Sequence, residues 1–478
     1  VEGDTNERGD LFRHDRLTGD TIRVSLDANG NEFPDGVQPQ ADLSGDGKVV
    51  VFDTAWRDDS LPTPYEPGCR GHGIALARNI ETGETTCVSV DGSGAPADQL
   101  GVGTLIVDGL VTNYDGRFVA YATNAPLGLG DGNGGTLDVY VIDRTTGLVQ
   151  RATEAFGGGD ADGPASEPRI SADGRYVAFV SEATNLVEGD TNGVADIFVF
   201  DRLTGVTERM SVGSDGAEAN GASTRSLDVS YDGRFVVFGT EATNLADLEC
   251  QLVLVDRALG TRDCIDVGQD GEPAEGFVNT PTVNADGTMV AFVATDSSLG
   301  SYDDSAFSHV YVRLREPRPV DTWPPVPDEV VPVVAPTTVD IASVDGTGEW
   351  GSANSGGASV SRNGRWVAFW TDAPNISGDA TEGMRHIVLR DLESGTSTVL
   401  TAGANGPSNR SYSGRIAMSD SGSVIAFHSE ATNLVPNDTN GSDDVFVFRR
   451  GSGTLERVSL TYDGTELQRD ARAPWLSA

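Results

Sequence analysis

Hydrophobic residues along the chain fall in short runs, and one arrangement of these runs recurs. In its clearest copy, an Asp-Gly pair precedes the apolar segment 176–180, and a second apolar segment covers 196–201. Both are apolar almost throughout, which is typical of β-strands covered on both faces. Asp and Gly tolerate the positive φ angles of a tight hairpin turn. With no convincing amphipathic helix, the pattern predicts an all-β protein.

Each copy of the repeat predicts four strands. In the clearest copy, strand a ends at 168–171, strand b covers 176–180, strand c 196–201 and strand d 207–212. Four-stranded antiparallel units repeated along a chain indicate a β-propeller, with an open sandwich array as the alternative. The recognisable copies begin at Ser44, Asn113, Ser171, Ser230, Asn284, Ser361 and Ser419.

The repeat resembles a known family. Its core, Ser-Ala-Asp-Gly-Arg-Tyr-Val-Ala-Phe at 171–179, followed by Asp-Ile-Phe-Val-Phe-Asp-Arg at 196–202, is similar to the TolB-type, WD40-like propeller unit. The resemblance covers essentially the whole chain and implies a propeller. In TolB such a propeller is an interaction scaffold without catalysis, and in prolyl-oligopeptidase relatives it gates a separate hydrolase domain. We expect one domain over 1–478, with insertions at about 57–72 and 316–336.

The strand count predicts most simply an eight-bladed ring. Residues 1–6 match 187–192, between strands b and c, and residues 475–478 match the end of strand a. The two ends would share an eighth blade that lacks strand b. Three explanations stay open: the native chain extends further, a neighbouring molecule donates a strand, or seven blades close the ring and the ends are accessories.

Charge and composition exclude several classes of function. The chain of 478 residues has 33 basic and 73 acidic side chains, a formal net charge of −40. Such a charge repels nucleic-acid phosphates and anionic lipid. No run of 18 apolar residues suggests a membrane-spanning helix, and the sequence as given starts without a secretion signal. We therefore expect no nucleic-acid partner and no membrane insertion.

The four cysteines are arranged as two pairs that each flank a predicted hairpin. Facing residues of adjacent antiparallel strands lie within disulfide range. The pairs predict two disulfides and an oxidising compartment, extracellular, cell-surface or periplasmic. Four free buried thiols are the alternative. The paired residues are Cys69 with Cys87, and Cys250 with Cys264.

An acidic motif recurs in the loops between strands b and c. It places carboxylate and amide oxygens on a tight loop, as Ca²⁺ requires, and resembles in shortened form the calcium loops of integrin-type propellers. The alternative is an Asx-turn, in which Asp and Asn side chains bind the loop backbone. Calcium is the only cofactor we expect. The candidate ligands are Asp4, Asn6 and Asp10; Asp131, Asn133 and Asp138; Asp190, Asn192 and Asp196; and Asp438, Asn440 and Asp444.

Two other features have structural interpretations. An Asp-Arg pair after strand c, as at Asp201-Arg202, is expected to hold carboxylates and carbonyls between neighbouring blades. The proline-rich segment 316–336 favours polyproline II, either as a stiff surface loop or as a docking segment.

Signals for catalysis are weak. The five histidines show no metal-ligand spacing, and no nucleophile elbow, phosphate-binding loop or zinc-protease motif is present. We therefore predict a non-catalytic secreted or cell-surface propeller that binds a protein partner or self-associates. The first alternative is a subunit of an extracellular filament or surface layer, joined by strand donation at the terminal blade. The second is a hydrolase or lyase with a carboxylate-lined central channel.

Overall fold

The computed structural model describes residues 5–54, 74–95, 97, 106–128, 130–223, 225–295, 299, 307–315, 339–378, 384–403, 406–409, 414–461 and 464–478. Both predicted insertions, 57–72 and 316–336, lie outside these ranges, as do Asp4 and Cys69. The chain divides into two compact units, and we describe each by itself.

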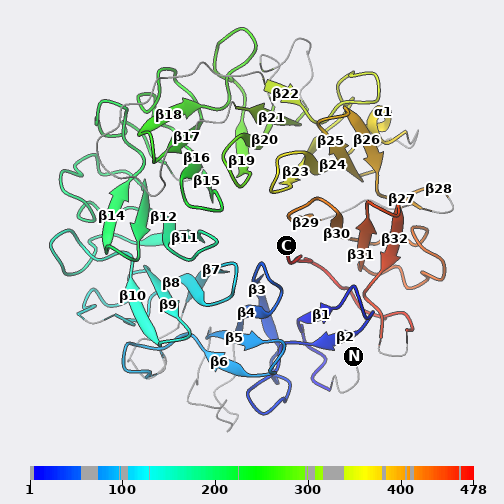
Figure 1. The fold of residues 1–478 in the computed structure, drawn as a ribbon, viewed down its shortest axis with the longest axis horizontal. Helices are drawn as coiled ribbons and strands as arrows, with labels where there is room; N and C mark the ends of the chain where they lie inside the picture. The colour runs from blue at the N-terminus through cyan, green and yellow to red at the C-terminus, as the bar shows by residue number, and fades with distance from the viewer. Residues whose placement is uncertain are drawn as a thin grey trace. The chain divides into compact units, whose positions relative to one another are not determined.

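The first unit comprises Val1–Val212, Ala222–Thr224 and Ser477. It holds one two-stranded sheet, β1-β2, and three four-stranded sheets (Figure 1). The strands are β1 (Phe12–His14), β2 (Thr21–Arg23), β3 (Val37–Leu43), β4 (Val49–Thr54), β5 (Ala75–Asn79), β6 (Thr85–Cys87), β7 (Val107–Thr112), β8 (Phe118–Thr123), β9 (Asp138–Asp143), β10 (Leu148–Arg151), β11 (Ala165–Ile170), β12 (Tyr176–Ser181), β13 (Asp196–Asp201) and β14 (Val206–Arg209).

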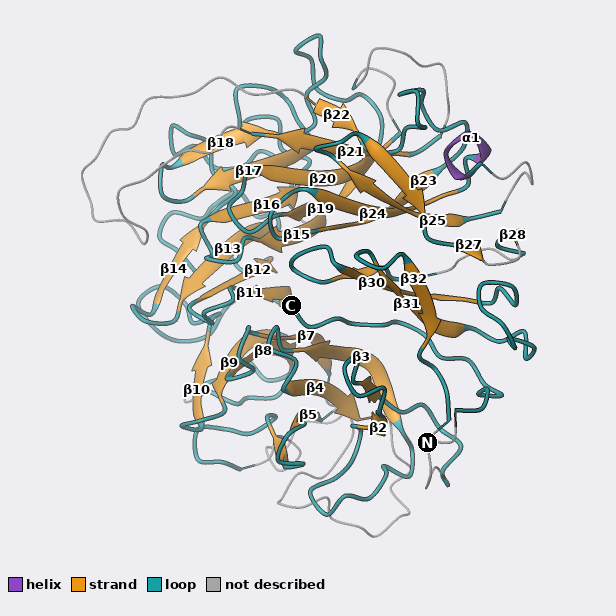
Figure 2. Ribbon diagram, turned by 45° about the vertical axis from the view of Figure 1, so that its right-hand side comes forward, coloured by secondary structure: helices purple, strands orange, loops and turns teal. Residues whose placement is uncertain are grey.

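The second unit comprises Gly213–Gly221, Arg225–Leu476 and Ala478. It holds four four-stranded sheets, the short pair β27-β28 and the one helix among the described residues (Figure 2). The elements are β15 (Arg225–Val229), β16 (Phe235–Gly239), β17 (Leu252–Asp256), β18 (Thr261–Cys264), β19 (Val278–Val283), β20 (Met289–Ala294), β21 (His309–Leu314), β22 (Val339–Ile341), β23 (Ser355–Val360), β24 (Trp366–Thr371), α1 (Pro374–Ser377), β25 (His386–Asp391), β26 (Thr396–Val399), β27 (Ala402–Gly403), β28 (Gly406–Pro407), β29 (Ala417–Met418), β30 (Val424–Ser429), β31 (Asp444–Arg449) and β32 (Thr454–Arg457).

Each four-stranded sheet is an antiparallel meander of strands a to d in chain order. In the sheet β11–β14, strands b and c are buried at every position, whereas β14 is at least partly exposed throughout. The apolar cores therefore form around strands b and c, as the sequence predicts. Seven sheets of this construction are the blades of a β-propeller, and the all-β fold class is confirmed with seven four-stranded blades.

The expected eighth blade has two of the three strands predicted for it. Its strands c and d are present as β1 and β2, which pair with each other. The residues expected to end its strand a, 475–478, form no strand. Leu476 packs instead against the apolar cluster of Val424, Ala426 and Val447 in the last blade. Local sequence similarity predicted an extended strand here, but a strand needs a backbone partner, and no strand pairs with these residues in the described part of the chain.

The repeated Asp-Gly turn is fastened by its own side chains. Ser171 Oγ donates to Asp173 and accepts from the backbone N–H of Tyr176 at 3.0 Å, which fixes the a–b hairpin. Gly174 has φ of 72°, and a Cβ at this position would lie 2.1 Å from the ring of Phe118 in the preceding blade. Glycine is thus required twice, by the backbone conformation and by the packing between blades.

The Asp-Arg pair after strand c has the structural role expected for it. Arg175 binds Asp201 of its own blade through two hydrogen bonds, of 3.0 and 2.7 Å. Arg202 donates to the carbonyl of Gly174 and lies over the ring of Phe118, 3.6 Å from its centroid. Arginine therefore fastens strand c to the a–b turn and contacts the neighbouring blade.

Candidate metal centre in the acidic b–c loops

The predicted carboxylates lie around the start of strand c. Asp196 is the first residue of β13 and is fully buried, and Asp190 lies in the loop before it with 8% of its surface exposed. Arg209, the last residue of β14, reaches back to both, with Nη1 2.8 Å from Asp190 and 3.5 Å from Asp196. The guanidinium of Arg209 therefore lies among the carboxylate oxygens that the sequence pattern indicated as metal ligands.

The loop amide and a hydroxyl complete this arrangement. The side-chain N–H of Asn192 donates to Asp196 at 2.9 Å, and its oxygen accepts from the backbone N–H of Val194 at 3.2 Å. Ser211 Oγ donates to Asp196 and accepts from the backbone N–H of Ile197 at 3.0 Å. The amide oxygen of Asn192 is therefore engaged in the Asx-turn that we considered as the alternative to metal binding.

We call the three positions represented by Asp196, Arg209 and Ser211 the loop clamp. The pattern recurs in three further blades. In each, an arginine follows the carboxylate by thirteen positions, and a serine or threonine follows it by fifteen. In two of the three the arginine pairs with the carboxylate, whereas Arg151 pairs with Asp131 of the same loop, and each hydroxyl donates to the carboxylate. The other charged clamps are Asp10, Arg23 and Ser25; Asp138, Arg151 and Thr153; and Asp444, Arg457 and Ser459.

The other predicted ligands are distributed around these clamps. Asp131 forms an ion pair with Arg151 at 3.5 Å and accepts a short hydrogen bond from Tyr140. Asn133 donates to Asp138 at 3.1 Å. Asn6, by contrast, donates to the carbonyl of Phe33 rather than to Asp10. The structure thus groups most of the candidate residues, with arginine as the cation that the structure itself provides.

The loop before β31 carries an additional carboxylate that the sequence motif did not reveal. Oxygen atoms of Asp438, Asp444 and Glu466 all lie within 4.8 Å of one another. Nη1 of Arg457 lies 3.3, 3.0 and 2.9 Å from the three side chains, respectively. Glu466 was missed because it follows strand d, 22 residues after the nearest predicted ligand. Among the described residues, this cluster is the one possible metal site made only of carboxylates.

The pKa values of two carboxyl groups in this cluster are shifted in opposite directions. Burial, reinforced by Asp444 and Glu466, raises the pKa of Asp438 to about 6. The backbone N–H of Thr439 lowers the pKa of Glu466 to about 2, with further hydrogen bonds from Thr439 Oγ1 and Arg457. Carboxylates at such short separations resist simultaneous ionisation unless a cation neutralises them.

In two blades a histidine replaces the carboxylate of the clamp, and no charge pair forms. His386 stands at the carboxylate position, Val399 at the arginine position and Thr401 at the hydroxyl position, with Nδ1 of His386 3.0 Å from Thr401 Oγ1. His309 and Ser343 make the corresponding pair at 3.4 Å. Sequence spacing made the histidines look scattered, yet two of them occupy the same place in their blades.

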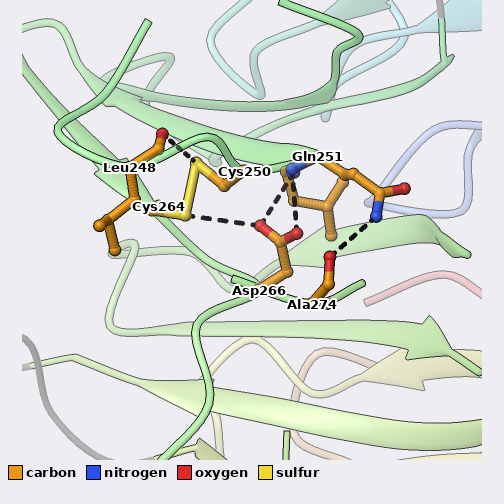
Figure 3. Close-up of a disulfide and its surroundings, with 7 residues drawn as sticks. Leu248, Cys250, Gln251, Cys264, Asp266 and Ala274 are labelled. Atoms are coloured by element: carbon orange, nitrogen blue, oxygen red, sulfur yellow. Dashed lines mark hydrogen bonds between the residues drawn. A yellow bond between two sulfur atoms is a disulfide. The ribbon is translucent and has the colours of Figure 1, made fainter. Parts of the chain in front are cut away.

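In the blade β15–β18, a disulfide stands where the arginine would be. Cys264 ends β18 and is bonded to Cys250, with 5.7 Å between their Cα atoms (Figure 3). Asp266 takes the hydroxyl position and accepts from the backbone N–H of Gln251 and Leu252 at 2.9 and 3.1 Å. The predicted Cys250–Cys264 disulfide is confirmed. Cys87 is also disulfide-bonded, but its predicted partner Cys69 lies outside the described residues.

No protein-family model and no curated protein matches this chain. Solved propeller structures resemble it at low identity. An oligogalacturonate lyase in complex with manganese is 14% identical, covering 87% of this chain and 85% of that one, with a TM-score of 0.43. A putative TolB from Agrobacterium tumefaciens is 16% identical, covering 64% and 86%, with a TM-score of 0.32. The β-propeller domain of the Trilobed protease from Pyrococcus furiosus is 14% identical, covering 74% and 84%, at 0.37. These likenesses concern the fold and carry no argument about the site.

None of the described helices is long and apolar enough to cross a membrane.

Proposed function

We propose that this protein is a non-catalytic binding module of an oxidising compartment, secreted or at the cell surface, which presents its b–c loops to a protein partner. One observation carries the proposal: the hydroxyl position of the clamp is filled in every blade. The residues are Ser25, Ser89, Thr153, Ser211, Asp266, Ser343, Thr401 and Ser459, and each binds the start of strand c by a hydrogen bond.

Loops fastened in this way suit recognition. Binding requires that mobile segments be ordered, and a loop that is already held by its blade loses less conformational entropy when a partner docks. Loops on a rigid scaffold are also where binding residues concentrate. The net charge of −40 favours a partner with a basic surface, because opposite charges accelerate and orient association.

The disulfides support the compartment. Cys250 and Cys264 are bonded across a hairpin, and disulfides of this structural kind persist in secreted and envelope proteins.

Calcium at the acidic loops is part of the proposal, because the donors are hard oxygens at closely spaced positions. The calcium proposal predicts a melting temperature that falls on chelation; an unchanged midpoint would argue against it.

Crosslinking in the native host tests the binding role. The intact chain would be crosslinked in the medium or envelope, and a captured candidate would be purified and titrated against it. We expect an affinity that weakens with salt and falls with Glu188→Lys, at an exposed b–c loop position, but not with Glu81→Lys at the other end of a strand c. Turnover of a substrate by the purified chain, or equal effects of the two substitutions, would count against the proposal.

A second candidate function, a filament subunit joined by strand donation, is favoured by β1. Strand c of each complete blade pairs on both sides, whereas β1 pairs with β2 alone among the described residues. A sheet edge with unpaired backbone groups can accept a strand from another chain. Concentration-dependent polymers in analytical ultracentrifugation would support this function, and a monomer at all concentrations would refute it.

A further inference from the structure

Asp438 has an environment that its ion pair with arginine does not explain. Its side chain is 2% exposed, and neither carboxylate oxygen accepts a hydrogen bond. Its contact with Nη1 of Arg457, at 3.3 Å, is the longest of the three that this nitrogen makes to carboxylates. Buried carboxylate oxygens without hydrogen bonds are costly, so these two point to a ligand at this place.

The charges of the cluster do not balance. Asp438, Asp444 and Glu466 contribute −3 when ionised, and Arg457 contributes +1, which leaves −2 in a largely buried space. Asp444 and Glu466 are satisfied by hydrogen bonds from Ser459 and Thr439. The carboxylate oxygens without hydrogen bonds therefore belong to Asp438, and one divalent cation would neutralise the remaining charge of −2.

We propose that Asp438, Asp444 and Glu466 form a binding site for a divalent cation of the calcium class, and that Arg457 is its built-in competitor. All donors are carboxylate oxygens, which favour Ca²⁺ over the softer transition metals. This inference deepens the calcium part of the proposed function and does not depend on partner binding.

Competition follows from the shared oxygens. Nη1 of Arg457 contacts the same three side chains that the ion requires, and arginine remains charged at any physiological pH. Its other terminal nitrogen donates to the carbonyl of Asn437 at 3.0 Å, which gives the guanidinium an anchor beside the cluster. The ion must displace an internal cation, so the wild-type site binds weakly, in the range of about 10⁻⁴–10⁻³ M that is typical of extracellular calcium modules.

Calcium titration of the intact chain, by calorimetry in 0.15 M salt, tests the site. We expect Asp438→Asn to bind one ion per chain fewer than the wild type. The control is Asp270→Asn, an exposed carboxylate in a turn outside the acidic b–c loops, and it should bind as many ions as the wild type. Equal ion counts for wild type and Asp438→Asn would overturn the proposal.

The role of Arg457 is tested separately. Arg457→Met should bind the ion at least about tenfold more tightly, whereas Glu466→Gln should bind it about tenfold more weakly. If Arg457→Met folds only in the presence of calcium, that result also supports competition, because the ion then replaces the missing charge. Unchanged affinity in a folded Arg457→Met would refute competition, and unchanged affinity in Glu466→Gln would refute the ligand set. Each result is independent of whether a protein partner is found.

Discussion

The blades β11–β14 and β23–β26 hold the corresponding b–c loop in different ways, the first with charged side chains and the second without a charge pair. The first uses a buried carboxylate and arginine, Asp196 and Arg209, whereas the second has His386 and Val399 at these positions. In the second blade His stands in place of Asp and an aliphatic residue in place of Arg. The blade that carries His309 and Ile341 shows the same two replacements. A buried charge requires a partner, so the two positions change together.

The hydroxyl position is common to both kinds of blade. Ser211 and Thr401 each accept a hydrogen bond from the backbone N–H of the second residue of strand c, at 3.0 and 3.2 Å. Both kinds of blade therefore keep a hydroxyl at this position of the clamp, and the ion pair is one of several ways to fill the space beside it. Five experiments test that conclusion.

Removing the arginine alone should have the largest effect. Arg209→Met leaves Asp190 and Asp196 buried without their cation, and we expect the free energy of unfolding to fall by about 3–5 kcal/mol. Urea denaturation measures the change. Val399→Met is the control in the uncharged blade, with a loss under about 1.5 kcal/mol because Val399 is partly exposed and carries no charge. Equal losses at the two positions would show that the charge pair does not matter.

Removing the disulfide should cost somewhat less. The double variant Cys250→Ala, Cys264→Ala opens a loop with a sequence separation of 14, which corresponds to about 3 kcal/mol in the chain-entropy account. Denaturation of the oxidised wild type under the same conditions is the reference. A loss below about 0.5 kcal/mol would mean that Asp266, with its two backbone hydrogen bonds, holds this loop without the covalent bond.

Transplanting the uncharged clamp should cost less again. The triple variant Asp190→Ala, Asp196→His, Arg209→Val removes all three charges together, and replacing a buried ion pair by apolar groups is often neutral. We expect a net loss under about 2 kcal/mol, smaller than that of Arg209→Met alone. A triple variant less stable than the single one would show that the charged and uncharged clamps are not interchangeable.

Asp53 provides a buried carboxylate without an arginine clamp. Burial raises its pKa from 3.8 to about 7, and its Oδ1 has no hydrogen-bond partner. The folded state therefore holds this proton more tightly than the unfolded state, so the contribution of Asp53 to stability decreases as pH rises from about 4 to 7. Asp53→Asn should melt at a higher temperature than the wild type at pH 8 and show a smaller difference at pH 4. The same difference at both pH values would contradict the assignment.

An exposed ion pair should have the smallest effect. Lys48 and Glu81 lie 3.3 Å apart with about half or more of each side chain exposed. Lys48→Ala should change the free energy of unfolding by less than about 0.5 kcal/mol, because water screens such pairs. A loss comparable to that of Arg209→Met would remove the distinction between buried and exposed charges on which the comparison rests.

Much of the fold could be predicted from local sequence, because each blade repeats the same short-range signals. The apolar runs of strands b and c, the Asp-Gly turn and the Cys250–Cys264 pair all appear in the structure. The irregularity in strand a could not: β11 shifts register between Ser166 and Arg169, and Glu167 there has φ of 52°. Such a bulge depends on packing across strands rather than on one residue's preference.

The candidate site could be predicted only in part. The acidic motif located Asp438 and Asp444, because both are close in sequence, but neither Arg457 nor Glu466 belongs to that motif. They reach the loop through the hairpin of strands c and d and the turn that follows. A motif search within the b–c loop thus found the anions without the cation that neutralises them.

The amino-acid sequence by itself determined the strands, the turns and their repetition, because these depend on hydrophobic period and on local backbone preference. Only the tertiary structure decided that seven blades are four-stranded, that residues 475–478 form no strand, and which arginine faces which carboxylate. These outcomes depend on backbone partners and on charges that folding brings within about 3 Å of one another. The residues involved are too far apart in the sequence for a local pattern to reveal them.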